Sequence, residues 1–221
     1  GNDIYGIFPM ILGTFYITGG SLVIGIPLGL LMAVFLSRYC PKKIYGLVNS
    51  LVELLAGIPS IIYGFFGMVV LVPFVKNNFA GNGNSIFTAA ILLGIMILPL
   101  IIRTAQEALI AVPDSFREGS FGIGAGKLRT VFRIVLPSAM PGILSGIILA
   151  IGRIVGETAA LMYTSGTVAQ IPKSLFGSGR TLALHMYSLS GEGLHTNQAY
   201  ATAVVLLIIV LIINQLSSFV A

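Results

Sequence analysis

Two charged residues within an apolar segment carry the clearest chemistry in this sequence. Arg153 and Glu157 stand four positions apart in GRIVGETAAL, so in a continuous helix both side chains project from one face. A lone charge in a membrane costs at least about 2.5 kcal/mol, so we expect the two to pair and to face protein or water. Arg153 is suited to hold an oxyanion by bidentate hydrogen bonding, with Glu157 fixing its rotamer or exchanging partners. The alternative is a permanent ion pair that only sets the helix register.

A second candidate patch lies in ELLAGIPSIIYGFFG. Glu53 stands about six residues inside its apolar run, roughly 9 Å from the start, where it either closes an inner gate with a basic residue or is an interfacial carboxylate. Pro59 removes a backbone donor and disfavours helix at the preceding residue, so a break is expected over residues 57–60. Backbone groups freed at Pro59 and Ser60 are further candidates for a pathway. Arg103 is interpreted as a topology anchor.

The composition indicates the elements that must position these residues. Of 221 residues, 56% are hydrophobic and 9% are charged, and the mean hydropathy is +1.00, whereas soluble domains carry roughly 25% charged residues. Since a membrane span needs about 20 apolar residues, five spans are predicted. They cover residues of about 8–36, 47–75, 86–102, 138–161 and 198–221. The sequence thus predicts an all-α membrane protein with a single transmembrane domain over residues 1–221 in the lipid bilayer.

The basic residues predict the orientation. With the N-terminus outside, the loop at residues 37–46 and the segment at residues 103–137 are cytoplasmic and hold eight of the twelve Lys and Arg residues. This distribution satisfies the positive-inside rule, which explains the net charge of +5 without nucleic acid. An external N-terminus without a signal peptide would require a preceding span, so a sixth, N-terminal helix is expected ahead of residue 1.

The polar segment 103–137 is predicted to form two short amphipathic helices. Pro113 suits the first turn of a helix, Asp114 and Glu118 lie near its positive end, and a run of glycines ends it. Three apolar residues, Phe116, Phe121 and Ile123, would be exposed unless a partner covers them. We therefore expect a docking surface for a water-soluble partner, the alternative being a solvated loop without one.

The sequence contains no catalytic machinery that we can identify. A phosphate-binding GxxxxGK[ST] loop is absent, so ATP would have to be hydrolysed by a separate subunit. The single cysteine, Cys40, excludes an internal disulfide, and His185 and His195 lack carboxylates at metal-ligand spacing. No enzyme activity, metal or cofactor is expected for this chain.

The polar segment resembles the EAA signature of permease subunits of binding-protein-dependent ABC importers. The resemblance is carried by Glu118, Gly119, Ser120 and Gly124, followed by the ILP-like ending at Leu136 and Pro137. It implies a type I ABC importer permease fold in which the first helix of the loop is a coupling helix seated on a dimer of ATP-binding cassette ATPases. The sequence departs from the family at Gly119 and Ser120, where alanines are commoner. Both residues are small, so close docking remains possible.

Three further segments are similar to the permeases of phosphate importers. They are ELLAGIPSIIYGFFG, EALIAVPDSFREGS and GRIVGETAAL. The sequence is nearer to that of the A-type permease subunit than to that of the C-type subunit. The resemblance implies an inner-membrane protein that moves inorganic phosphate past Arg153, with a homologous second permease and an extracytoplasmic phosphate-binding protein. The segment 180–189 is expected to lie on the outer surface and to contact that binding protein. Competing interpretations are a molybdate or tungstate permease, a non-transporting scaffold or sensor subunit, and an ATP-independent channel.

Overall fold

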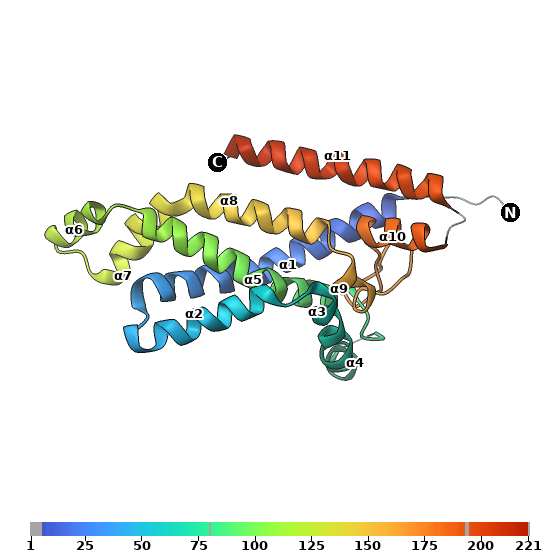
Figure 1. Ribbon diagram of the computed structural model, residues 1–221, viewed down its shortest axis with the longest axis horizontal. Helices are drawn as coiled ribbons and strands as arrows, with labels where there is room; N and C mark the ends of the chain where they lie inside the picture. The colour runs from blue at the N-terminus through green and yellow to red at the C-terminus, as the bar shows by residue number, and fades with distance from the viewer. Residues whose placement is uncertain (1–5, 80, 193–194, 221) are drawn as a thin grey trace.

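The structure is a computed structural model that describes residues 6–79, 81–192 and 195–220. These residues form an elongated bundle of helices without a strand in the described ranges (Figure 1). The long helices are α1 (Phe8–Val34), α5 (Ile86–Ala111), α8 (Leu136–Val155) and α11 (Thr196–Val220). Five helical segments of the described chain are long and apolar enough to cross a membrane, which confirms the predicted number: Phe8–Tyr39, Ser60–Asn78, Ile86–Ala111, Lys127–Val155 and Thr196–Gln215.

Helix α5 lies at the centre and is the most buried of the five. It packs between α1 and α8 (Figure 1). Close approach of α1 requires glycine, because a Cβ at Gly25 would lie 2.7 Å from Ile97 Cδ1 and one at Gly29 would lie 2.6 Å from Ile101 Cγ2. Small residues at helix interfaces in membranes allow such approach. The helix α1 continues as a π-helical turn, Phe35–Tyr39, to the first loop.

The second span begins at Ser60 rather than near residue 47. The chain forms α2 (Lys42–Gly57), breaks, and resumes as α3 (Ser60–Phe66), a π-helical turn (Gly67–Leu71) and α4 (Val72–Asn78). Ile58 and Pro59 adopt extended backbone angles, as expected where proline removes a donor. The break over residues 57–60 is therefore confirmed, but it separates two helices instead of bending one.

The polar segment is shorter than predicted, because helix α5 passes through Pro99 and continues to Ala111. Only the first of the two expected helices is separate: it is α6 (Asp114–Gly122). The second, α7 (Lys127–Thr130), runs through a π-helical turn (Val131–Val135) into α8. The predicted amphipathic second helix is thus the first part of the fourth span. That span ends at Val155, before the predicted end near residue 161.

The segment between the last two long helices is partly buried. It contains α9 (Ala159–Met162) and α10 (Leu182–Glu192). All five residues from Thr181 to His185 are buried, so the expectation that residues 180–189 lie on the surface is wrong for this part. Leu182 is held because its backbone N–H donates to the Thr14 hydroxyl at 3.0 Å. Later residues of α10, such as Tyr187, remain exposed.

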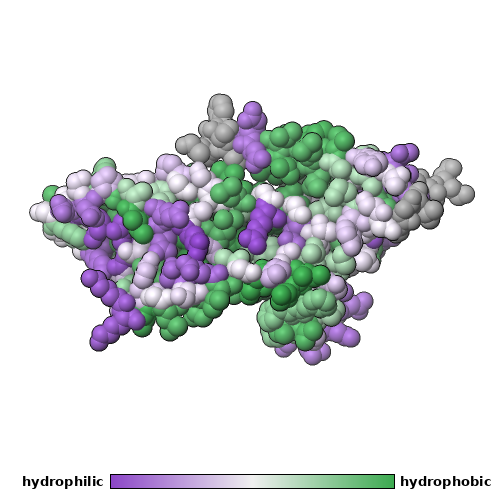
Figure 2. Space-filling model, viewed as in Figure 1, coloured by the Kyte–Doolittle hydropathy of each residue, from purple (hydrophilic) through white to green (hydrophobic). Residues whose placement is uncertain are grey.

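The polar ends of the bundle agree with the predicted orientation. Helices α6 and α7 and the turn between α1 and α2 gather at one end, whereas α9 and α10 lie toward the other (Figure 1). Hydrophilic residues concentrate at the α6 end, and apolar surface covers much of the middle (Figure 2). Both loops that were assigned to the cytoplasm are therefore on the same side of the bundle.

Candidate functional site: a charged cluster and an inner docking loop

Arg153 and Glu157 do not form the predicted pair. Helix α8 ends at Val155, so the helical spacing that would align the two side chains is interrupted. Glu157 Oε1 instead accepts hydrogen bonds from the backbone N–H groups of Thr158 (3.1 Å) and Ala160 (3.0 Å) at the start of α9. A carboxylate is well placed there, because the first N–H groups of a helix lack partners. In this structure Glu157 orders the chain after α8.

Arg153 is exposed near the end of α8 and makes no ion pair or hydrogen bond with the described parts of the chain. The Tyr63 hydroxyl donates to the Leu55 carbonyl at the end of α2, at 2.8 Å. This hydrogen bond spans the break between α2 and α3, while Arg153, exposed on α8, keeps its charge available to an anion.

Packing of α3 against α9 brings the two predicted patches together. The rings of Phe65 and Tyr163 stack with centroids 4.8 Å apart. A Cβ at Gly64 would lie 2.9 Å from the Tyr163 ring and 3.1 Å from the Ala159 carbonyl oxygen, so glycine is required at this crossing. Ser60 at the start of α3 and the segment after α8 thus belong to neighbouring elements, which sequence spacing alone did not reveal.

The carbonyl of Pro59 takes part in the first turn of α3. It accepts hydrogen bonds from the backbone N–H groups of Ile62 (3.0 Å) and Tyr63 (3.4 Å) and so begins α3. A role in a pathway for backbone groups freed at Pro59 and Ser60 therefore stays a prediction. Tyr63 and Tyr163 were missed in the sequence, although a hydroxyl-bearing ring beside the proline break was a signal for Tyr63.

Glu53 finds its basic partner in Arg103. Glu53 Oε1 lies 2.9 Å from an Arg103 guanidinium nitrogen, and both side chains are about half exposed. Asn49 donates to the same carboxylate at 3.0 Å, and Gln106 of α5 donates to the Tyr45 hydroxyl at 2.9 Å. Arg103 does not end its helix as predicted, because α5 continues for two further turns. These contacts hold the otherwise exposed α2 against α5.

The π-helical turn that follows α1 contacts both α5 and α7. Arg38 donates to the Leu109 carbonyl near the end of α5, and Lys127 Nζ lies 4.6 Å from the centroid of the Tyr39 ring. The predicted loop residue Ser120 is buried, and its hydroxyl forms a 2.8 Å hydrogen bond with that of Thr130. The sequence did not indicate Arg38, Tyr39 or Thr130, since their partners are distant in the chain.

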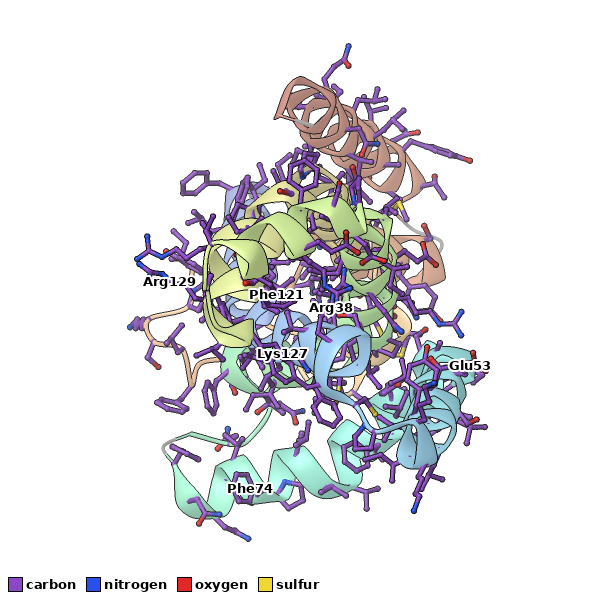
Figure 3. All side chains as sticks on the ribbon, turned by 90° about the vertical axis from the view of Figure 1, so that its left-hand side faces the viewer. Arg38, Glu53, Phe74, Phe121, Lys127 and Arg129 are labelled. Atoms are coloured by element: carbon purple, nitrogen blue, oxygen red, sulfur yellow. The ribbon has the colours of Figure 1, made fainter. Side chains whose placement is uncertain are left out.

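Helix α6 presents the predicted docking residues outward. Pro113 precedes the first turn, an ion pair of 2.6 Å joins Asp114 and Arg117, and Gly124 ends the turn with φ +84°. The exposed fractions are 51% for Phe116, 42% for Phe121 and 88% for Ile123. Glu118 and Gly119 are exposed as well. Figure 3 views the bundle from this end and labels Phe121, Arg38 and Lys127. We call this exposed part of α6, with Ile123, the inner docking surface.

No group of three or more His, Cys, Asp and Glu side chains in the described ranges is arranged to hold a metal ion.

The chain matches the family described as binding-protein-dependent transport system inner membrane component over residues 25–221. The probable ABC transporter permease protein YqgH of Bacillus subtilis is 34% identical, with 97% of this chain and 72% of that protein covered. The phosphate transport system permease protein PstC of Mesorhizobium japonicum is 32% identical, with 97% and 73% covered. PstA 1 of Mycobacterium tuberculosis is 35% identical, with 95% and 68% covered.

The solved structures show the same fold. The MetNI methionine ABC transporter in an inward-facing conformation matches with a TM-score of 0.73 and 22% identity, covering 98% of this chain and 93% of the matched chain. A bacterial ABC transporter involved in the import of alginate matches with a TM-score of 0.70 and 19% identity, covering 97% and 79%. Together with the five spans, the family match leads to one conclusion: this chain belongs to the binding-protein-dependent transport system inner membrane components and is a multi-pass, inner-membrane permease subunit of an ABC importer.

Proposed function

We propose that this permease subunit imports inorganic phosphate. The observation that carries the proposal is the exposed Arg153, which has no ion-pair partner in the described chain. The two relatives named as phosphate transport permeases, PstC and PstA 1, support the same substrate. The name of YqgH states no substrate. The fold is shared with a methionine transporter, so the fold alone does not indicate that the substrate is an anion.

A guanidinium suits phosphate because its N–H groups match two oxygens of the anion in one plane. Arg153 would bind the anion in transit. Glu157 would act indirectly, by fixing the start of α9. The Glu157 carboxylate accepts hydrogen bonds from backbone N–H groups and forms no ion pair with Arg153.

The inner docking surface supports coupling to a separate ATPase. Phe116 and Phe121 are exposed on a short helix whose position is fixed through Ser120 and Thr130. In our proposal a dimer of ATP-binding cassette ATPases receives α6, and its closure moves α5 and α8 through the Arg38 and Lys127 contacts. A second homologous permease would complete the pathway, and an extracytoplasmic phosphate-binding protein would deliver the anion at the α10 end.

Substrate competition distinguishes phosphate from the other oxyanions. The complete transporter in proteoliposomes, with its binding protein outside and ATP inside, should accumulate labelled phosphate. A tenfold excess of molybdate or tungstate should leave the rate unchanged. Uptake of labelled molybdate in place of phosphate would reject the substrate assignment, and assembly of the complex without any uptake would favour a scaffold or sensor subunit.

A further inference from the structure

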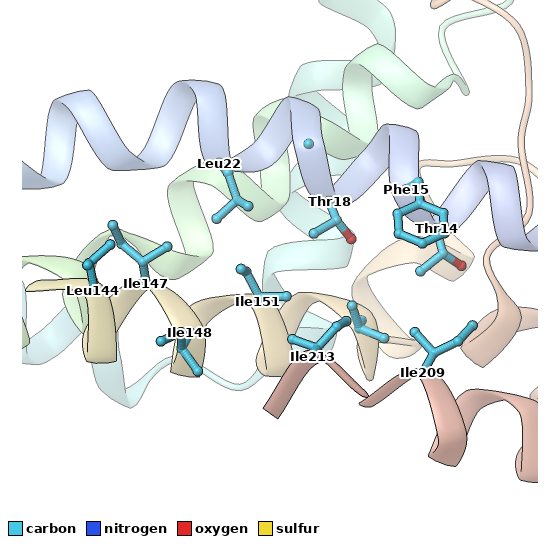
Figure 4. A pocket seen from close by; sticks show the side chains of 12 residues that line it. Thr14, Phe15, Thr18, Leu22, Leu144, Ile147, Ile148, Ile151, Ile209 and Ile213 are labelled. Atoms are coloured by element: carbon cyan, nitrogen blue, oxygen red, sulfur yellow. The ribbon is translucent and has the colours of Figure 1, made fainter. Parts of the chain in front are cut away.

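The cavities of the described chain differ in whether their lining could select a ligand. A cavity of about 490 Å³ between α1, α8 and α11 is lined mainly by aliphatic side chains (Figure 4). Its lining contains no charged group, so nothing there distinguishes one apolar occupant from another. A hollow of about 350 Å³ at the inner end is different, because two arginines line it. We call it the arginine pocket, and it is lined by Ser120, Ile123, Gly124, Ala125, Arg129, Arg133 and Ile134.

Arg129 and Arg133 give the arginine pocket its charge. Arg129 lies on α7 and Arg133 on the π-helical turn that leads into α8, and their spacing of four positions puts both side chains on one face. Both are exposed, and neither forms an ion pair within the described parts of the chain. No acidic residue lines the pocket. Like charges on adjacent turns repel each other, so the pair favours an anion that accepts hydrogen bonds from both.

The arginine pocket lies at the depth of the lipid headgroups. Helix α8, Leu136–Val155, has 20 residues, the number needed to cross a hydrocarbon core of about 30 Å. Counted from Leu136 at 1.5 Å per residue, Arg133 lies about 5 Å and Arg129 about 10 Å beyond the inner boundary of that core. The headgroup layer is about 5–8 Å thick on each side. Since both arginines line one hollow, this hollow opens where the phosphates of the inner leaflet lie.

The surroundings favour a lipid over a carboxylate of a partner protein. Seen from the inner end, Arg129 projects sideways from the bundle, in the plane of the membrane surface (Figure 3). An ATPase on the inner docking surface would lie beyond α6, toward the viewer of that figure. Glu53 of α2, a candidate pathway residue, projects from the opposite side (Figure 3), so a second permease that shared the pathway would leave the Arg129 side to lipid. Leu128 and Phe132, next to the two arginines in the sequence, are 66% and 44% exposed, a combination of basic and apolar groups that is typical of a membrane interface.

We propose that the arginine pocket binds the headgroup of an anionic phospholipid of the inner leaflet, whose phosphodiester accepts hydrogen bonds from Arg129 and Arg133. A guanidinium donates two parallel N–H···O bonds to phosphate oxygens, and basic groups at the cytoplasmic surface of a membrane attract anionic lipids. Thr130 lies between the two arginines in the sequence and forms the 2.8 Å hydrogen bond with Ser120 of α6. The bound lipid therefore also stabilises the segment that positions α6.

Photolabelling with two lipids that differ in headgroup charge tests this site. The complete transporter is placed in phosphatidylcholine nanodiscs that contain a small fraction of a probe, either phosphatidylglycerol or phosphatidylcholine with a diazirine next to its glycerol backbone. After irradiation, labelled peptides are identified by mass spectrometry. We expect the anionic probe to label residues 120–134 at least about fivefold more than the zwitterionic probe. Helix α11, the least buried of the five spans, is the internal reference that both probes should label equally.

Substitutions of the arginines address the pocket itself. Each basic residue near the membrane surface should strengthen binding of the anionic probe about fivefold. At a probe fraction far below saturation, labelling of residues 120–134 should therefore fall about fivefold in Arg129→Gln and about thirtyfold in the double variant Arg129→Gln with Arg133→Gln. The matched control, Lys42→Gln with Lys43→Gln, also removes two exposed positive charges at the inner end of the bundle, but outside the pocket. It should keep the full labelling of residues 120–134.

Three results would overturn the proposal. Equal labelling of residues 120–134 by the two probes is expected if a carboxylate of the ATPase or of the second permease fills the pocket. Equal labelling of the double-arginine variant and the unsubstituted transporter would place the lipid elsewhere. Loss of labelling on addition of excess inorganic phosphate, but not of chloride at the same ionic strength, would assign the pocket to free phosphate instead of a lipid.

The test remains decisive if the double variant fails to assemble. In that case Arg129→Gln decides, because unchanged labelling by the anionic probe in this single variant rejects the proposed site. The readout is bound lipid, so it does not depend on which substrate is transported.

Discussion

Glu53 of α2 and Arg103 of α5, 50 positions apart in the sequence, form a 2.9 Å ion pair that joins the two helices. Each residue was interpreted separately from the sequence, the acid as a gate or interfacial group and the base as a topology anchor. The structure makes them partners on the inner half of the bundle, where α2 has only one buried residue, Val52. The pair therefore contributes to keeping α2 against α5.

Removing this ion pair should loosen α2 without unfolding the bundle. Because both side chains are about half exposed, Glu53→Gln should cost no more than about 1 kcal/mol of stability. A larger effect is expected on the accessibility of α2, measured by hydrogen exchange of residues 42–57 in the assembled transporter. The swap Glu53→Arg with Arg103→Glu should restore much of the protection, and equal exchange in all variants would exclude a role for the pair.

The inner docking surface should bind the ATPase through its aromatic residues. Phe121→Ser removes a 42% exposed ring from α6 and is expected to reduce co-purification of the ATPase at least tenfold, because aromatic residues at interface centres dominate binding energy. Tyr187→Ser, at an exposed position of α10, is the control and should co-purify normally. Full ATPase binding by Phe121→Ser would place the contact elsewhere.

Arg38 should affect coupling more than assembly. Its guanidinium donates to the Leu109 carbonyl and lies in the span that ends beside the inner loop. Arg38→Met leaves that carbonyl without this donor, so ATP hydrolysis should persist while phosphate uptake per ATP falls several-fold. The measurement is the ratio of the two rates in proteoliposomes. Parallel loss of both rates, together with loss of ATPase binding, would instead indicate a role in assembly.

The crossing of α1 and α5 should not tolerate a side chain at Gly29. A Cβ there would lie 2.6 Å from Ile101 Cγ2, so Gly29→Val should destabilise the subunit by about 1–3 kcal/mol through overpacking. Gly46→Val is the control, since its Cβ meets nothing within 4 Å. The loss of monodisperse protein on heating measures the difference, and identical profiles would show that the two helices separate more easily than the structure indicates.

Local patterns in the sequence predicted much of the architecture. Apolar run lengths gave the number of spans, Pro59 gave the break between α2 and α3, and Pro113 with Asp114 gave the start of α6. Each of these features depends on residues that are neighbours in the chain. Helix ends were less predictable: α5 continues past the predicted end at residue 102 to Ala111, and α8 ends at Val155, before Glu157.

The candidate site was predicted only in part. The sequence identified Arg153 and the residues of α6, but it paired Arg153 with Glu157 on the assumption of an unbroken helix. The contact of α3 with α9 and the hydrogen bond between Ser120 and Thr130 follow from packing between separate elements. No spacing rule relates such residues, so a single sequence could not place them together.

Substitution of Arg153 tests whether this residue binds the anion in transit. Initial rates of labelled phosphate uptake are compared for the unsubstituted transporter, Arg153→Gln, Arg153→Lys and the exposed control Lys173→Gln, with ATPase co-purification measured in parallel. We predict at least a tenfold loss of uptake in Arg153→Gln with normal ATPase binding, partial retention in Arg153→Lys, and no change in Lys173→Gln. Normal uptake by Arg153→Gln would contradict the account and leave Arg153 outside the transport pathway.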